Sequence, residues 1–327
     1  MKPIGGFFEL ELPKPINNFP KNSLQFWCGR ASLKFILSQL QISKLYLPAY
    51  ICDSVLEPLV ELNIEYEFYA IDTSFFPSDL LDLKEKEFFL YVNYFGICEE
   101  NVNKLKTYYA DKLILDNTQA FFSTIPNDIW CFNSLRKFFG VSDGSFLYYP
   151  TDFVCDTNNL YREKIENNID YSHLINRLIG NQQVAYQEFQ QSEFKFTTQL
   201  YQLSKLSESI FERINLNEVK QNRLSNFIFL HQHLGKYNFI KIDLDKIVGY
   251  KNNIPFSYPF YPKKEINRSE LAKQNIFVPQ LWKEVEQRDK KFKLEKEISK
   301  NILPLPIDQR YEREEMKFIV KIILSRL

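Results

Sequence analysis

The chain has 327 residues, of which 45% are hydrophobic, so it can bury a large core and has room for more than one domain. Lys and Arg total 41, as do Asp and Glu, and this balance provides no net field that would attract nucleic acid or an anionic membrane. Five dispersed cysteines without a C-x-x-C pair argue against a disulfide framework or a structural zinc site and fit a reducing compartment. The chain starts without the apolar region of a signal peptide, and no uncharged run approaches the roughly 18 residues needed to cross a bilayer. We therefore expect a soluble, cytoplasmic protein.

The first 116 residues predict alternating strands and helices. Residues 29–40 place apolar side chains at helical spacing and begin with the small residues Gly29, Ala31 and Ser32. Backbone N–H groups at such a helix start suit a phosphate, but a simple helix cap is the more common role of small residues there. Further apolar runs predict strands at 44–47, 64–71, 87–92 and 112–116, with helices at 50–62 and 99–110. Repeated strand–helix–strand units imply a mainly parallel sheet.

The composition changes twice in the second half of the chain. A polar stretch with helical apolar spacing comes first, and we interpret it as a region that links two domains. Strand-like runs then reappear at 239–242 and 276–278, and an amphipathic helix is expected at 312–327. The predicted organisation is a large domain of residues 1–160, a helical linker of residues 161–236 and a smaller α+β domain of residues 237–327.

Candidate chemistry concentrates in residues 113–147. One apolar run ends on Asp116, with Gln119 three residues later, and a second apolar run leads to Ser134 and Lys137. Buried strands that end in short polar loops build ligand sites at the carboxyl edge of open α/β sheets. A carboxylate, a hydroxyl and an amine at one such edge fit pyridoxal 5′-phosphate (PLP), whose pyridine nitrogen pairs with an acid and whose aldehyde forms a Schiff base with a lysine.

Each of these residues also has an ordinary structural explanation. Asp116 and Ser134 can stabilise turns, and Gln119 can simply face solvent. Lys137 and the preceding Arg136 can form an exposed cationic pair. A Schiff-base lysine must be able to lose its proton, and an apolar surround with an adjacent cation favours the neutral amine. The joint order and spacing of the residues is what favours a PLP site.

The segments ILDNTQAF and CFNSLRKFFGVSDGSFL resemble the DegT/DnrJ-type sugar aminotransferases, which are fold-type I PLP enzymes. The signature of that family has an acid with a glutamine three residues on, a Ser-Phe element, the Schiff-base lysine and a Gly-Asp-Gly-Gly turn. Further segments resemble the family in the expected order: CGRASL, LPAYICDSVLEPLVELNIEYEFYAID, VNYFGICEENVNKL, NIFVPQLW and LPLPIDQRY. The resemblance implies an α/β fold with a mainly parallel seven-stranded sheet, a homodimer with active sites at the subunit boundary, and amino transfer by a ping-pong route.

The resemblance also assigns roles to individual residues. Lys137 would be catalytic, because it would hold PLP and then move the substrate proton. The family aromatic that stacks on the cofactor ring falls near Cys52, so a neighbouring tyrosine would have to replace it. The expected cofactor-binding residues are Ala31, Ser32 and Ser134 at the phosphate, Asp116 and Gln119 at the ring, Tyr50 or Tyr94 stacked on the ring, and Lys137.

One departure from the family pattern leaves two registers open. An alignment without gaps from Cys131 to Gly144 puts Arg136 on the family's lysine position, and an arginine stays protonated and cannot form the Schiff base. The spacing from Ser134 to Lys137 instead matches the Ser-x-x-Lys of other fold-type I aminotransferases. A shift of one residue in this loop restores Lys137, and no other lysine lies in the loop, so we expect Lys137 to carry the chemistry.

Three functions follow from these expectations. The first is a PLP-dependent aminotransferase that acts on a keto-sugar, often nucleotide-linked in this family, with an amino acid such as glutamate as the donor. The second is a PLP-dependent dehydration or elimination on the same frame. The third is a cofactor-free homologue that binds a ligand or partner, with Arg136 gripping an anion. No metal is expected in any of them.

Overall fold

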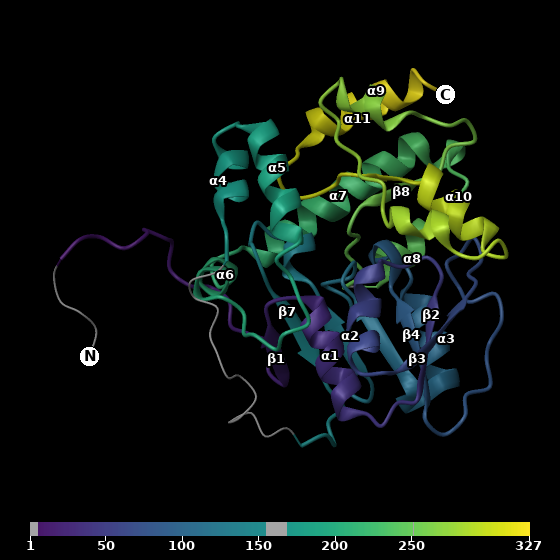
Figure 1. The fold of residues 1–327 in the computed structure, drawn as a ribbon. Coiled ribbons are helices and arrows are strands. Elements are labelled where there is room, and N and C mark those ends of the chain that lie inside the picture. Colours follow the sequence, from purple (N-terminus) through teal and green to yellow (C-terminus); the bar gives the residue numbers. More distant parts are fainter. Residues whose placement is uncertain (1–5, 155–168, 251) are drawn as a thin grey trace.

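The computed structural model describes residues 6–154, 169–250 and 252–327. The large sheet lies in the lower part of Figure 1, and the C-terminal elements lie above it. The predicted domain boundary at 160 and the fifth cysteine, Cys155, lie outside the described residues. Among the helices of the described residues, none is both long enough and apolar enough to span a membrane.

Seven strands form one sheet in the order β1-β7-β6-β5-β4-β2-β3. The strands are β1 (Ser23–Phe26), β2 (Lys44–Pro48), β3 (Glu65–Tyr69), β4 (Glu87–Val92), β5 (Leu113–Asn117), β6 (Trp130–Asn133) and β7 (Ser145–Tyr148). β7 pairs antiparallel with both of its neighbours, whereas β3, β2, β4, β5 and β6 pair in parallel. The predicted mainly parallel, seven-stranded sheet is therefore confirmed.

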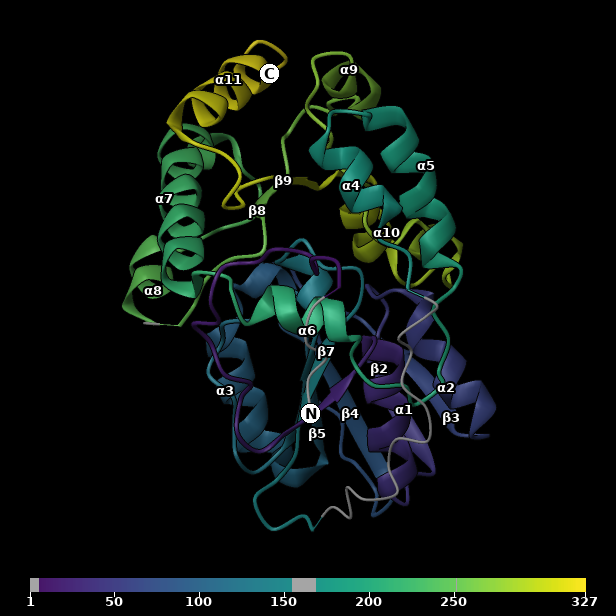
Figure 2. The ribbon, with the colours of Figure 1, turned by 90° about the vertical axis from the view of Figure 1, so that its left-hand side faces the viewer.

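Helices cover both faces of the sheet, which explains why its central strands are continuously apolar. In Figure 2, α3 (Glu99–Tyr109) lies on one face, and α1 (Gly29–Gln39) and α2 (Leu56–Glu61) lie on the other. Every residue of β5 is buried as a result. The helix expected at 50–62 begins late, because a 3-10 helix (Asp53–Val55) precedes α2.

The second half of the chain is mainly helical. Its helices are α4 (Ser172–Leu178), α5 (Gln182–Glu193), α6 (Lys205–Phe211), α7 (Leu216–Leu234), α8 (Leu244–Gly249), α9 (Arg268–Ala272), α10 (Lys293–Asn301) and α11 (Arg313–Leu324). Two short strands, β8 (Tyr258–Phe260) and β9 (Leu303–Leu305), pair antiparallel. A separate hydrophobic cluster joins α7 to β8, β9 and α11. The exact domain boundaries stay predictions.

The strands expected at 239–242 and 276–278 are not formed. Asn238 explains the first difference, because its side chain takes the hydrogen bonds that a strand partner would provide. Its carboxamide oxygen accepts the N–H groups of Ile240 and Tyr261, and its nitrogen donates to the Pro259 carbonyl. Asp243 then caps α8, so the backbone turns into a helix instead of extending a ladder.

Candidate active site

The carboxyl ends of β4, β5 and β6 meet at one edge of the sheet. Asp116, near the end of β5, is in register with Val92 of β4 and Phe132 of β6. β6 then leads through Ser134 into a 3-10 helix (Leu135–Lys137). Parallel pairing thus brings the acid of one strand and the lysine that follows the next strand to the same edge.

Asp116 is a buried carboxylate. It is only 5% exposed, and its Oδ1 accepts the Thr118 N–H at 2.8 Å. The Thr118 hydroxyl also acts on this carboxylate as a hydrogen-bond donor. Burial raises the pKa of Asp116, while the Thr118 hydroxyl and N–H and the charge of Lys137 lower it. The acid is therefore close enough to Lys137 to sense its charge.

Lys137 is exposed as a residue, and its charge acts on groups at the sheet edge. Its charge lowers the pKa values of both Asp116 and Cys52, in each case against the larger raising effect of burial. The amine also lies 5.8 Å from the centre of the Phe256 ring, within the range of a cation–π contact. Of these three neighbours, Asp116 belongs to β5, Cys52 precedes the helical segment of residues 53–61, and Phe256 lies in the C-terminal half of the chain.

Arg136 points elsewhere. Its guanidinium forms an ion pair with Glu193 at the end of α5 and lies 4.2 Å from the centre of the Phe196 ring. Its charge acts on Cys28 and Asp143. The two adjacent cations of the 3-10 helix therefore lie in different surroundings. The pKa of Asp116 is affected by the charge of Lys137 and not by that of Arg136.

Gln119 lies beneath the same edge and is fully buried. Its carboxamide oxygen accepts the Phe95 N–H at 2.8 Å, which fixes the orientation of the side chain. Its amide nitrogen is buried and has no hydrogen-bond partner among the described residues. Leaving a buried donor unpaired costs about 1–3 kcal/mol, so this nitrogen marks a place where an acceptor is missing.

The two candidate stacking tyrosines lie in the core. Tyr50 and Tyr94 are fully buried and stack on each other at 5.6 Å, and the Tyr94 hydroxyl donates to the Tyr50 carbonyl at 2.8 Å. The Trp282 ring covers Tyr50 edge-on at 4.6 Å. Cys52, near which the sequence resemblance places the family's aromatic, is only partly buried, and the charge of Lys137 lowers its pKa against the larger raising effect of burial.

The three residues expected at the phosphate differ in whether their polar groups already have hydrogen-bond partners. Ala31 and Ser32 lie in the first turn of α1 and are fully buried. The Ser32 hydroxyl is already bonded to the Ser145 hydroxyl at 2.7 Å, and the Ala31 N–H faces the Cys28 sulfur. Ser134 is half-buried, and within the described residues its hydroxyl makes no hydrogen bond. Of the three side chains, Ser134 has the free hydroxyl.

Sequence reasoning missed several polar residues around this edge. Asp143 is fully buried and accepts hydrogen bonds from the Ser204 N–H and the hydroxyls of Ser204 and Ser207, so it anchors the start of α6. Arg223 of α7 is also buried and contacts the carbonyl of Phe138, the residue after Lys137. No local pattern marks these residues, because their partners are remote in the sequence.

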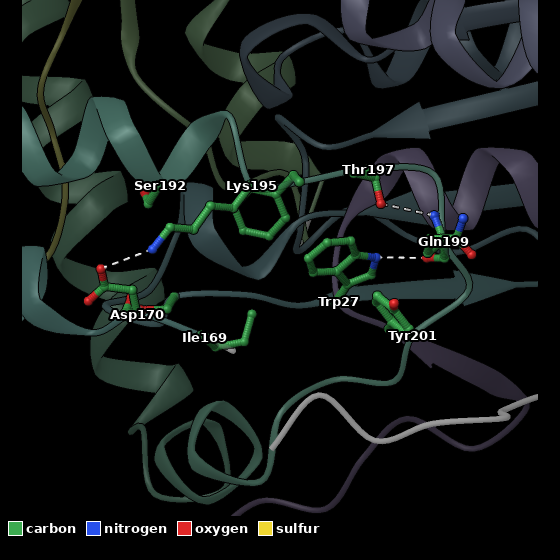
Figure 3. Close-up of a pocket in the computed structure, with 10 residues that line it drawn as sticks. Trp27, Ile169, Asp170, Ser192, Lys195, Thr197, Gln199 and Tyr201 are labelled. Atoms are coloured by element: carbon green, nitrogen blue, oxygen red, sulfur yellow. Dashed lines mark hydrogen bonds and ion pairs between the residues drawn. The ribbon is translucent and has the colours of Figure 1, made fainter. Parts of the chain in front are cut away.

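Two hollows lie outside this edge. One lies beside Trp27 and has a volume of about 550 Å³. Here the Trp27 indole donates to the Gln199 carbonyl at 2.8 Å, and Lys195 pairs with Asp170 at 3.3 Å (Figure 3). A cleft of about 1050 Å³ separates the α4–α5 pair from α9 and α11. None of the residues expected to bind the cofactor lines either hollow.

Comparison with known proteins gives a structural match without a sequence match. No family model matches the chain, and no curated protein matches it by sequence. An aminotransferase of the DegT/DnrJ/EryC1/StrS type from Brucella abortus matches with a TM-score of 0.59 and 10% identity, over 93% of this chain and 85% of the other. The aminotransferase PseC of Helicobacter pylori, involved in pseudoaminic acid biosynthesis, matches with a TM-score of 0.61 and 14% identity, over 93% and 86%.

A third match has a different activity. The GDP-4-keto-6-deoxy-D-mannose-3-dehydratase of Escherichia coli, solved with bound hydrated PLP, has a TM-score of 0.58 and 14% identity, over 92% of this chain and 87% of that chain. The resemblance to DegT/DnrJ-type proteins noted in the sequence is therefore confirmed at the level of the fold. At such low identities the shared fold leaves the reaction open.

Proposed function

We propose that this chain, which has the fold of the DegT/DnrJ-type sugar aminotransferases, is a PLP-dependent aminotransferase. It would transfer an amino group from an amino acid to a keto-sugar. One observation carries the proposal: the amine of Lys137 and the buried carboxylate of Asp116 share one sheet edge, while Arg136 is held away by Glu193 and Phe196.

The residues at this edge fit PLP in three respects. Asp116 offers a buried carboxylate, which suits a protonated ring nitrogen. The unpaired amide nitrogen of Gln119 suits an oxygen acceptor such as the ring hydroxyl. The Ser134 hydroxyl is free to donate to a phosphate. When bound, PLP supplies an electron sink that stabilises negative charge on the substrate carbon.

The protein's own groups then have separate tasks. Lys137 would hold the cofactor through its Nζ and would move a proton to and from the reacting carbon of the substrate. Asp116 would keep the ring nitrogen protonated, because a carboxylate stabilises a positive charge beside it. The Ser134 hydroxyl would donate to the phosphate, and the Ala31 N–H would join it by exchanging the Cys28 sulfur for a phosphate oxygen. Cys52 is a small side chain near the position at which the resemblance places an aromatic.

The proposal is tested by asking which amine takes the cofactor. Purified protein is incubated with PLP, reduced with borohydride and digested, and the pyridoxyl mass is located by mass spectrometry. We expect the mass on Lys137, and its loss in the Lys137→Arg variant, which keeps the positive charge but cannot condense. A label on another lysine refutes the residue assignment, and no label at all favours the cofactor-free alternative.

Amino transfer is tested separately from cofactor attachment. An amino donor such as glutamate should release one equivalent of its keto acid per PLP-loaded chain when no acceptor is present, because the amino group stays on the loaded protein. An elimination is the second candidate, since a structure with the same fold is a dehydratase with bound hydrated PLP. Loss of water from a keto-sugar without net amino transfer would favour that reaction.

We also propose that the active form is a homodimer in the cytoplasm with sites at the subunit boundary. This assembly rests on the resemblance to the aminotransferase family. Sedimentation equilibrium should then give twice the chain mass of 39.1 kDa. A single-chain mass in the PLP-loaded protein would contradict the proposal.

A further inference from the structure

Arg223 is the most deeply buried large cation of the described residues. It lies in the second turn of α7 and is 2% exposed. Burial lowers its pKa to about 10, and within the described residues it forms no direct ion pair with an acid. A buried charge without an acidic partner is costly, so its hydrogen bonds must compensate for lost hydration.

Those hydrogen bonds join three remote segments. Nη1 donates to the carbonyl of Phe256 at 2.9 Å and, at 3.5 Å, to that of Pro255. Nη2 donates to the Phe138 carbonyl at 3.3 Å, and Nε donates to Gln309 Oε1 at 3.1 Å. The guanidinium also lies 4.6 Å from the centre of the Phe138 ring. Because the guanidinium is planar and carries its donors in a fixed fork, these bonds constrain the segments relative to one another.

Gln309 reinforces the same point of contact. Its amide nitrogen donates to the Phe138 carbonyl at 2.9 Å, while its oxygen accepts from Arg223. The Phe138 carbonyl therefore receives two donors from elements that follow it by more than 80 residues. Phe138 is the residue after Lys137, so these bonds fix the backbone from which the Lys137 side chain extends.

The second segment held by Arg223 reaches the other side of the candidate site. Phe256 places its ring 5.8 Å from the Lys137 amine. Its N–H donates to the Phe95 carbonyl at 2.8 Å, and the Phe95 N–H donates to Gln119 Oε1, also at 2.8 Å. A continuous set of hydrogen bonds thus runs from Gln119 through Phe95, Phe256 and Arg223 to the backbone beside Lys137.

We propose that Arg223 is a positioning residue that sets the Lys137 amine at a fixed place relative to Gln119 and Asp116. The inference rests on the proposed function, because the position matters only if Lys137 condenses with the PLP aldehyde. A displacement of a reacting group by about 1 Å can cost roughly a hundredfold in rate, so a clamp on the adjacent residue has a measurable consequence.

The test compares variants of Arg223 with a variant that weakens the same helix elsewhere. Arg223→Met removes every donor at similar length, and Arg223→Lys keeps the charge and part of the hydrogen bonding. Leu230→Ala is the control, because Leu230 is fully buried in the other hydrophobic cluster of α7. All variants are compared for thermal unfolding and for the rate of borohydride-trapped PLP attachment to Lys137.

A second readout separates position from reactivity. Acetic anhydride labels exposed amines without needing an aligned partner, so its rate at Lys137 in cofactor-free protein measures access and nucleophilicity alone. We expect Arg223→Met to slow PLP attachment at least tenfold with little change in acetylation. Arg223→Lys should recover part of the rate, whereas Leu230→Ala should lower the unfolding temperature and keep the rate of attachment.

The outcomes distinguish the two proposals. If wild-type protein takes no PLP on Lys137, the proposed function fails and the positioning role fails with it. If wild-type protein is labelled and Arg223→Met attaches PLP as fast as Leu230→Ala, only the positioning role is overturned. Should Arg223→Met fail to fold, Gln309→Leu removes one donor to Phe138 and the Nε acceptor at a partly exposed position, and it should slow attachment about threefold. An unchanged rate in that variant overturns the inference.

Discussion

At the scale of single residues, the charge of Lys137 changes the cost of burying Asp116. Burial raises the pKa of Asp116 above its ordinary value of 3.8, so ionising this acid costs more in the folded chain than in the unfolded chain. Stability therefore falls as the pH rises from 3.8 through the pKa of the folded state. The positive charge of Lys137 limits this loss, because it lowers the same pKa.

Replacing Lys137 with Met should therefore destabilise the protein in a pH-dependent way. Without the charge, the pKa of Asp116 rises further, and more stability is lost as the acid ionises. We expect the difference in unfolding free energy between wild type and Lys137→Met to be small near pH 4 and larger at pH 7, where Asp116 is ionised in the unfolded chain and the lost attraction counts in full. Urea denaturation at several pH values measures it.

The control for this prediction is the same substitution made in an Asp116→Asn background. With no acid at position 116, the effect of Lys137→Met should no longer vary with pH, and the double-mutant cycle isolates the interaction between the two residues. An equal pH dependence in both backgrounds would show that the charge of Lys137 acts on another group.

Side-chain direction is what the sequence could not provide at this scale. The order of residues predicted that Asp116 follows a buried strand and that a lysine follows the next strand. It left Arg136 and Lys137 as alternatives, because adjacent residues of a 3-10 helix point in different directions and only their partners decide which one faces the site. Glu193, which takes Arg136, lies 57 residues further along the chain.

At the scale of elements, the short 3-10 helix after β4 (Tyr94–Gly96) packs closely against residues 254–256. Gly96 has φ of +67°, and a Cβ at this position would lie 2.8 Å from the Gln119 carbonyl oxygen and 3.0 Å from that of Ile254. Those oxygens belong to backbone and cannot move aside cheaply. Glycine is therefore required both by the turn and by the close approach of residues 254–256.

Gly96→Ala should lower the free energy of unfolding by at least about 2 kcal/mol, because a left-handed conformation costs a side chain about 1–2 kcal/mol and the contact with the Gln119 and Ile254 carbonyls adds to it. Gly140→Ala is the matched control, since nothing lies within 4 Å of its added Cβ. We expect that variant to stay within about 0.5 kcal/mol of wild type. Urea denaturation of both proteins decides the matter, and equal stabilities would contradict the packing of residues 254–256 against Gly96.

The sequence predicted elements best where a local rule governs them. Buried parallel strands and the helices between them follow from periodicity. Residues 239–242 have the same strand-like pattern, but the carboxamide of Asn238 substitutes for a strand partner. That competition depends on Tyr261 and Pro259, about 20 residues away, so no local rule reveals it.

At the scale of the whole molecule, a third hydrophobic cluster lies between the sheet core and the C-terminal core. It joins Phe138 and Phe139, which follow Lys137, to Phe211 of α6, Val219 of α7 and Ile254. The cluster brings together residues that are scattered over more than 100 positions, so no local pattern in the sequence could predict it. A ligand at the sheet edge would contact elements that this cluster already holds together.

PLP should therefore stabilise the folded chain as a unit. A ligand that binds only the folded state adds about 2.7 kcal/mol at a concentration 100 times its dissociation constant. For a chain of this size we expect a rise in unfolding temperature of roughly 5 °C in scanning calorimetry. Lys137→Ala should lose most of this rise, because it removes the amine that condenses with the aldehyde.

A ligand without the aldehyde shows how much of the stabilisation comes from covalent attachment to Lys137 and how much from the other contacts of the cofactor. The 4-deoxy analogue of pyridoxine 5′-phosphate keeps the ring nitrogen, the ring hydroxyl and the phosphate, so Asp116, Gln119 and Ser134 can still bind it. We expect it to raise the unfolding temperature less than PLP in wild type and by the same amount in Lys137→Ala. Equal shifts with both ligands in wild-type protein would show that attachment through Lys137 contributes nothing, and the absence of any shift would show that this edge of the sheet does not bind the cofactor.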